Sequence, residues 1–137
     1  MLVGTSYGGN LALEVALAAP HRVTALWLMG CNPSAPLAGG PDLAGGLQAT
    51  PEAVIDMLAG LVVHKEATAA AATFKAMAQR VGGPAGADQA RAVSTRLEAT
   101  SRFSVLTMPA LVADRFNRMR ASMARVLSFR RPLVCAV

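Results

Sequence analysis

Hydrophobic positions in the first thirty residues predict a strand, a helix and a second strand in succession. Residues 1–3 are a short apolar run. Pro20 ends the helix that follows, and its apolar positions, together with four alanines, leave nearly every face apolar: Leu11, Leu13, Val15 and Leu17. This pattern predicts a buried helix. Residues 23–29 are almost continuously apolar, as in a parallel strand covered on both faces. The three segments predict one right-handed βαβ unit.

The middle of the chain predicts a loop followed by three helices. Residues 31–46 hold seven Gly or Pro in sixteen positions, which predicts a loop that we extend to residue 50. Thr50, Pro51 and Glu52 form a helix start. The apolar stripe of this first helix is Val54, Ile55, Leu58, Leu61 and Val62.

The second and third helices are predicted from the same spacing of apolar residues. One covers residues 65–81 and is stopped by Gly82-Gly83-Pro84. The other lies near residues 88–98, with Ala90, Val93 and Leu97 on one side. Three amphipathic helices without an intervening strand form either a cap over an active site or a layer packed on the sheet. A cap lined with Ala, Leu, Met and Phe would imply an apolar acyl or alkyl group in the substrate.

Residues 4–9 read Gly-Thr-Ser-Tyr-Gly-Gly between the predicted strand and helix. This is the G-x-S-x-G spacing of a nucleophile elbow. Such a turn holds its serine in a strained conformation, and the residues two before and two after it approach so closely that glycine is needed. The helix N-terminus favours developing negative charge, and the Tyr7 backbone N–H would be one oxyanion donor. Ser6 is therefore the candidate nucleophile; the alternative is a Gly-rich turn with an incidental serine.

With this motif, residues 2–36 resemble the α/β-hydrolase fold family, from its fifth strand through its sixth. The stretch is similar to the esterase and lactonase-like members. Leu106-Thr-Met-Pro-Ala-Leu-Val-Ala113 resembles the short strand before that family's catalytic acid. The resemblance implies an α/β fold: a partial α/β-hydrolase domain of about three parallel strands with flanking helices. Within this single domain, residues 1–137, we expect strand-elbow-helix-strand (1–30), loop (31–50), cap-like helices (51–100), then a short strand and basic helix (101–137).

The rest of the family's catalytic triad has no clear counterpart. The family order is Ser, acid, His, but His21 and His64 both precede the acid position. About eleven helical residues place His21 roughly 16 Å from Ser6, and His64 is expected at a helix C-terminus. The family's Gly-x-x-Asp corresponds to Asp114-Arg-Phe-Asn117. Asn117 thus stands at the acid position, where an amide favours the wrong imidazole tautomer, and Asp114 is a possible substitute.

Two function classes follow from these observations. The first is a serine hydrolase by ancestry, acting on carboxylic esters through an acyl-enzyme on Ser6, with little or no turnover by this chain. The second is a non-catalytic remnant or binding module. The first strand needs neighbours on both sides, and the family's first four strands have no counterpart here. We therefore interpret the sequence as a partial copy whose exposed sheet edges favour self-association.

The positive charge lies at one end of the chain. Residues 1–114 carry a balance of −1 and residues 115–137 a balance of +6. The second segment predicts a basic amphipathic helix with Phe116, Met119, Met123, Val126 and Leu127 at helical spacing. It can flank the sheet with its arginines in solvent, dock on an acidic partner or lie on an anionic membrane. Peripheral membrane binding is thus a third function class. Nucleic acid binding is not expected, because no aromatic platform accompanies the charge.

Composition restricts the remaining possibilities. The chain is 53% hydrophobic and 15% charged, which is too apolar for a disordered protein. Cys31 and Cys135 have no metal-ligand spacing, so no metal, cofactor or disulfide framework is expected. No run of eighteen apolar residues predicts a membrane span, and a cytoplasmic location is the default expectation.

Overall fold

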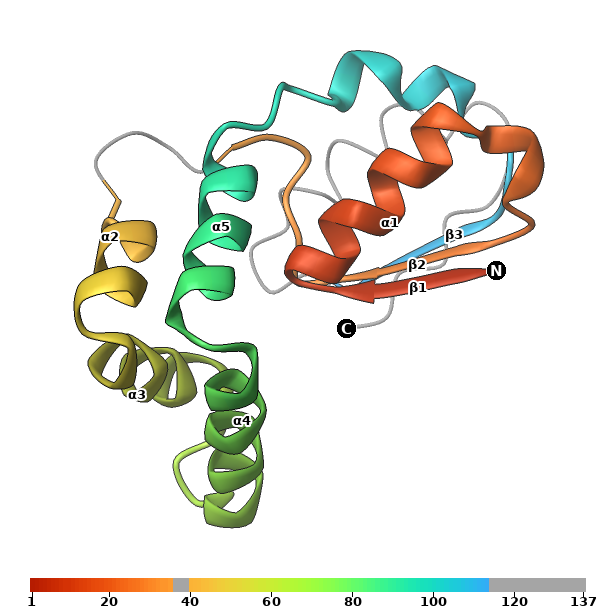
Figure 1. Ribbon diagram of the computed structural model, residues 1–137. Coiled ribbons are helices and arrows are strands. Elements are labelled where there is room, and N and C mark those ends of the chain that lie inside the picture. Colours follow the sequence, from red (N-terminus) through yellow and green to blue (C-terminus); the bar gives the residue numbers. More distant parts are fainter. Residues whose placement is uncertain (36–39, 114–137) are drawn as a thin grey trace. The chain divides into compact units, whose positions relative to one another are not determined.

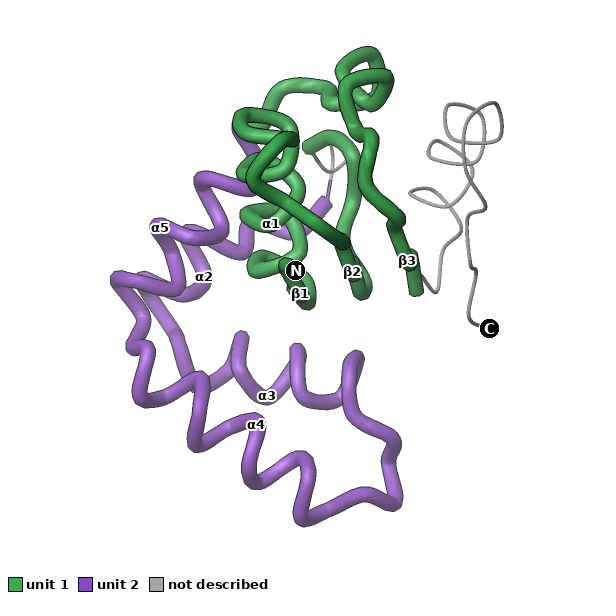
Figure 2. The backbone as a smooth tube through the Cα atoms, turned by 90° about the vertical axis from the view of Figure 1, so that its right-hand side faces the viewer, with its two compact units in different colours: residues 1–36, 96–137 green, residues 37–95 purple. Residues whose placement is uncertain are grey.

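The computed structural model describes residues 1–35 and 40–113, and the backbone divides into two compact units (Figures 1 and 2). The first, residues 1–36 and 96–137, is called the sheet unit, and the second, residues 37–95, the helical unit. The described elements of the sheet unit are β1 (Leu2–Thr5), α1 (Tyr7–Ala18), the 3-10 turn η1 (Pro20–Arg22), β2 (Leu26–Met29), the 3-10 helix η2 (Thr100–Val105) and β3 (Ala110–Ala113). Those of the helical unit are α2 (Leu43–Ala49), α3 (Pro51–Val62), α4 (Thr68–Val81) and α5 (Gly83–Ser94).

The sheet has three parallel strands in the order β1-β2-β3. Leu26 of β2 lies opposite Leu2 on one side and Ala110 on the other. The predicted βαβ unit and the third parallel strand are therefore confirmed, and the protein is a mixed α/β protein. β2 begins at Leu26, three residues later than predicted, because the preceding chain turns: the Val23 N–H donates to the Pro20 carbonyl in η1.

The core of the sheet unit lies between the sheet and α1, with η2 packed against the same helix (Figure 1). Its largest fully buried side chains come from all of these elements: Leu13, Leu26, Leu28, Phe103 and Val112. Burial of each such side chain stabilises the fold by about 1.5–3 kcal/mol. This one-sided core fixes the direction in which α1 leaves β1.

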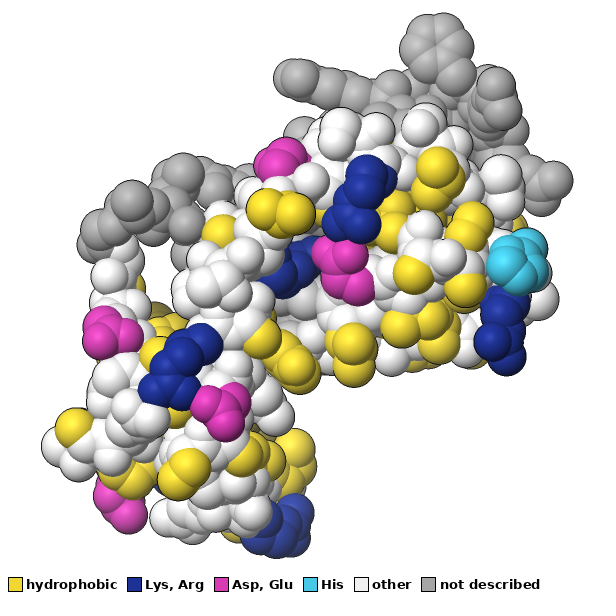
Figure 3. Space-filling view, turned by 45° about the horizontal axis from the view of Figure 1, so that its top comes forward, with side chains coloured by type: hydrophobic (Ala, Val, Ile, Leu, Met, Phe, Trp, Pro, Cys, Tyr) yellow, Lys and Arg dark blue, Asp and Glu magenta, His cyan; other side chains and the backbone are white. Residues whose placement is uncertain are grey.

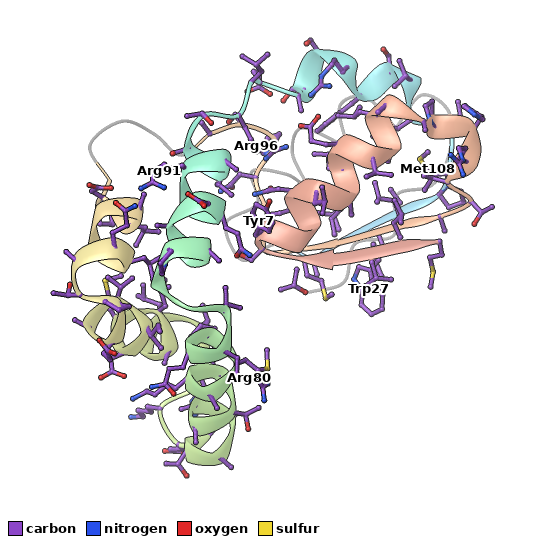
Figure 4. The ribbon with its side chains drawn as sticks, in the orientation of Figure 1. Tyr7, Trp27, Arg80, Arg91, Arg96 and Met108 are labelled. Atoms are coloured by element: carbon purple, nitrogen blue, oxygen red, sulfur yellow. The ribbon has the colours of Figure 1, made fainter. Side chains whose placement is uncertain are left out.

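α1 buries one face only, which corrects the prediction of a helix buried all round. Leu13 is inaccessible, whereas Leu11 is 54% exposed and Val15 43% exposed. A helix lying on a sheet presents one stripe to it, and no other described element of the sheet unit covers the outer stripe. The prediction that residues 23–29 are covered on both faces is also wrong, because burial alternates along β2. Trp27 is 39% exposed and points away from α1, from the opposite face of the sheet (Figure 4).

The helical unit contains α2 where the sequence predicted a loop. The Asp42 carboxylate accepts a hydrogen bond from the Gly45 N–H at 2.9 Å and so begins the helix. A Cβ on Gly45 would meet that carboxylate at 2.3 Å, and one on Gly46 would lie 2.8 Å from the Val54 side chain. Gly46 therefore allows close packing against Val54, whereas the number of glycines in this segment had suggested a loop.

The other helices agree with the predictions in number and differ at their ends. α3 starts at Pro51 as predicted, although the Thr50 hydroxyl forms no cap and instead donates to the Gly46 carbonyl. Gly82, with φ 80°, ends α4. α5 then starts at Gly83, five residues before the predicted helix, because proline is favourable in a first helical turn. Leu97, predicted on its apolar side, lies beyond its end and is 82% exposed.

Close contact of α2 with α5 organises the helical unit. A Cβ on Gly83 would lie 2.4 Å from the Leu47 carbonyl oxygen, so only glycine permits this approach. Ile55, Ala59 and Ala87 are the buried hydrophobic residues of the described part of this unit. The Lys75–Asp56 ion pair between α4 and α3 is exposed and contributes little. The cap interpretation of residues 51–100 stays a prediction.

Candidate functional site

Ser6 occupies a sharp turn at the carboxyl end of β1. Its φ of 52° and ψ of −120° make it the one non-glycine residue with positive φ in the described ranges. Its N–H donates to the Met29 carbonyl at 2.8 Å, and its own carbonyl accepts from the Asn10 N–H at 3.0 Å. The neighbouring strand and the first turn of α1 thus fix both sides of a conformation that costs about 1–3 kcal/mol. The predicted strand-turn-helix context of Ser6 is present.

The glycines around Ser6 have different roles. A Cβ on Gly4 would lie 2.2 Å from the Gly8 carbonyl oxygen, so Gly4 is required by the close approach. A Cβ on Gly8 would meet nothing within 4 Å, which corrects the expectation that both positions exclude a side chain. A Cβ on Gly9 would lie 3.0 Å from the Cys31 side chain and from the Gly4 carbonyl. Gly4 and Gly9 therefore allow α1 to start close to β1 and to the segment after β2.

The Ser6 side chain is exposed at the N-terminus of α1. It forms no capping hydrogen bond with the first turn, and that turn contains no acidic side chain. The N–H groups of a first turn have no acceptor within their helix, and the helix dipole places partial positive charge there. Tyr7, half-buried at the start of α1 (Figure 4), contributes one of these N–H groups. The arrangement is suited to an anion developing beside the Ser6 hydroxyl.

Within the described residues of the sheet unit, no triad is assembled around Ser6. His21 lies in η1, beyond the opposite end of α1. His64 belongs to the helical unit, two residues past the end of α3, and its Nδ1 accepts from the Glu66 N–H at 3.4 Å. In the described part of the sheet unit, no histidine or carboxylate forms a hydrogen bond with Ser6. Asp114, Asn117, Cys135 and the predicted basic helix lie outside the described residues.

Asn10 is a polar residue of the site that the sequence analysis missed. Its side chain is 6% exposed, and its Oδ1 has no hydrogen-bond partner among the described residues. A buried acceptor left without a partner costs about 1–3 kcal/mol. The signal was present in the spacing, because Asn10, Leu13 and Leu17 share the sheet-facing stripe of α1. Asn10 is thus a buried polar group one turn after Ser6.

Two carboxyl groups of the sheet unit have displaced pKa values. Burial would raise the pKa of Glu14, but hydrogen bonds and positive charge from Arg96 and Arg102 outweigh it and lower that pKa below its ordinary value. Hydrogen bonds from the hydroxyl and backbone N–H of Thr100 lower the pKa of Glu98. Neither carboxyl forms a hydrogen bond with Ser6, so neither supplies a general base for it.

Over residues 1–35 and 40–113, no three His, Cys, Asp or Glu side chains are grouped as metal ligands. No helix in the same ranges has the length and apolar character needed to cross a bilayer.

Comparison with protein-family models gave no match to the chain, and no curated protein matches it. The features of the chain that bear on function are therefore the motif at residues 4–9 and the geometry at Ser6. The α/β-hydrolase resemblance remains a proposal.

Proposed function

We propose that the sheet unit presents Ser6 as the nucleophile of a serine hydrolase of the α/β-hydrolase type, acting on carboxylic esters. The observation that supports this most strongly is the strained, exposed conformation of Ser6, φ 52°, between a parallel strand and a helix. Strain of this kind is concentrated at functional sites. A turn with no chemical role could use glycine at the same position without that cost.

The proposed reaction is acyl transfer to the Ser6 hydroxyl. The oxygen attacks the ester carbonyl carbon as its proton passes to a base, and a tetrahedral oxyanion forms. The Tyr7 N–H and the N-terminus of α1 stabilise that oxyanion. The carbon–oxygen bond of the ester then breaks, the alcohol leaves with a proton, and the acyl group stays on Ser6. Water hydrolyses this ester, releasing the acid and the free serine.

The general base that must accept the Ser6 proton limits the rate of this reaction. His21 lies beyond the far end of α1, and neither histidine follows the acid position in the order Ser, acid, His. We therefore expect the chain to react with strongly electrophilic probes and to turn over ordinary esters slowly or not at all. If residues 51–100 act as a cap, their Ala, Leu, Met and Phe side chains favour an apolar acyl or alkyl group.

A non-catalytic binding module is the second candidate. It is favoured by the Ser6 hydroxyl, which has no hydrogen-bond partner within the described residues. A serine without a base is a weak nucleophile. Such a module would keep the turn and the helix N-terminus as a recognition site without covalent chemistry.

A fluorophosphonate probe distinguishes the two candidates. The folded wild-type chain, Ser6→Ala and Ser101→Ala are incubated with the probe, and the modified peptide is identified by mass spectrometry. Ser101 is an exposed serine in η2, so its variant controls for nonspecific reaction. Labelling at Ser6 that is lost in Ser6→Ala and after denaturation supports the hydrolase. If the folded protein is not labelled at Ser6, the binding module replaces it.

A further inference from the structure

The helical unit is joined to the sheet unit by two stretches of chain that run through one charged cluster. The chain leaves the sheet unit at residue 36 and returns at residue 96. The residues just inside these two points belong to the sheet unit, and we call residues 32–35 and 96–99 the stem. Arg96 is the first residue of the returning side and directly follows the segment after α5 (Figure 4).

Direct hydrogen bonds join the two sides of the stem. Arg96 donates from Nη1 to the Asn32 carbonyl at 2.8 Å. Three residues later, the Ala99 N–H donates to the Pro33 carbonyl at 3.0 Å. One of these bonds comes from a side chain and the other from the backbone, so the two sides are held in register at two points.

Glu14 of α1 anchors the returning side. Arg96 Nη2 lies 3.0 Å from Glu14 Oε1, and Arg102 Nη2 lies 2.9 Å from Glu14 Oε2. Figure 3 shows acidic and basic side chains side by side on the surface of the sheet unit. The Arg96 side chain is only 10% exposed, against 45% for Arg102 and 38% for Glu14. Arg96 is therefore the buried member, and Glu14 is the carboxylate that compensates its charge.

The hydrogen bonding of Arg96 is incomplete. Its Nε is buried and has no partner among the described residues. A nearly buried guanidinium with one unsatisfied donor is stable in place only while its remaining partners hold it. Loss of Glu14 would leave that charge uncompensated and favour its transfer to water, which would also break the bond to Asn32.

We propose that Glu14 and Arg96 form a latch that closes the stem of the helical unit. With the latch engaged, residues 32–35 and 96–99 are held together on α1. With the latch broken, Arg96 moves into solvent and the two sides separate while the β-sheet stays folded. The latch is thus a conformational device at the stem of the helical unit, independent of any chemistry at Ser6.

Amide hydrogen exchange tests the latch, with the Ala99 amide as the reporter. In Glu14→Gln we expect Ala99 to exchange at least about tenfold faster than in the wild type, and to be accelerated by a larger factor than the amides of β2. Asp88→Asn is the matched control, since it removes an exposed ion pair with Arg91 inside the helical unit, and it should leave Ala99 unchanged.

Unchanged exchange of Ala99 in Glu14→Gln would overturn the proposal. Equal acceleration of Ala99 and the β2 amides would also overturn it, because the cluster would then serve only global stability. If Glu14→Gln does not fold, the wild-type protein is compared at low and high salt, which weakens ion pairs. Selective acceleration of Ala99 in high salt supports the latch, and its absence rejects it.

Discussion

Gly4 lies directly against the carbonyl group of Gly8, so closely that a Cβ on Gly4 would be 2.2 Å from that oxygen. The opposing atom is backbone and cannot rotate away. The same pair is asymmetric, because a Cβ on Gly8 would meet nothing within 4 Å. The turn at Ser6 therefore depends on one glycine of the motif far more than on the other.

This asymmetry gives the first prediction. Gly4→Ala should destabilise the protein by at least about 1–3 kcal/mol, because the strand or the helix must shift. Gly8→Ala should be neutral or stabilising by up to about 1 kcal/mol, since Gly8 lies in α1 and alanine favours helix. Urea unfolding of both variants measures the difference. Equal losses in the two variants would contradict the geometry.

Ser6→Gly should be more stable than the wild type by about 1 kcal/mol or more. Glycine adopts positive φ without steric cost, whereas serine is strained at φ 52°. Ser6→Ala is the control, because it removes the hydroxyl and keeps the strain, so its stability should stay near that of the wild type. Thermal unfolding compares the three proteins. A Ser6→Gly variant less stable than Ser6→Ala would argue against strain at this position.

Two leucines of α1 test which face of that helix is buried. Leu13→Ala should cost about 2–5 kcal/mol, because Leu13 is inaccessible in the core. Leu11→Ala should stay within about 0.5 kcal/mol, because Leu11 is 54% exposed. The free energies of unfolding are measured in urea. A cost at Leu11 as large as that at Leu13 would mean that the outer stripe is covered.

The packing of α2 on α5 depends on Gly83. Gly83→Ala should disrupt the helical unit, since the new Cβ would be 2.4 Å from the Leu47 carbonyl oxygen. Gly60→Ala in α3 is the matched control, because its Cβ would meet nothing within 4 Å and should stabilise that helix by up to about 1 kcal/mol. Circular dichroism at 222 nm reports the helix content. We expect a loss of signal and of thermal stability in Gly83→Ala alone.

Because the pKa of Glu14 is lowered in the folded protein, the free energy of unfolding depends on pH. A carboxyl whose pKa is lower in the folded state than in the unfolded state stabilises the fold at pH values above its unfolded pKa. That contribution is lost as the pH falls through the folded pKa, which for Glu14 lies below its ordinary value of 4.5. The charged groups bonded to Glu14 are Arg96 and Arg102.

Glu14→Gln should therefore be less stable than the wild type at neutral pH, and the difference should shrink on acidification. Urea midpoints between about pH 7 and about pH 3 measure it. Glu66→Gln, at an exposed residue between α3 and α4, is the control and should follow the wild type. A wild-type advantage that is constant over this range would show that the Glu14 charge is not responsible.

The sequence by itself determined the local structure around Ser6. Apolar runs separated by Gly-Thr-Ser-Tyr-Gly-Gly required a strand, a turn and a helix, because these residues have strong local preferences. The start of α3 at Pro51 followed from the same kind of signal, whereas the third strand was expected from the family resemblance of residues 106–113. The sequence also predicted a long-range feature, the parallel pairing of β1 with β2, because a βαβ connection allows few other arrangements.

Only the tertiary structure decided which glycines are needed, which faces are buried and where charges meet. The sequence pattern marks Gly83 as a helix breaker, but in the structure it allows a close approach to the Leu47 carbonyl that a Cβ would prevent. Arg96 meets Glu14 across 82 positions, and no local pattern encodes such a contact. The reason is physical: propensity acts over a few neighbouring residues, whereas burial and ion pairing depend on segments that folding alone brings together.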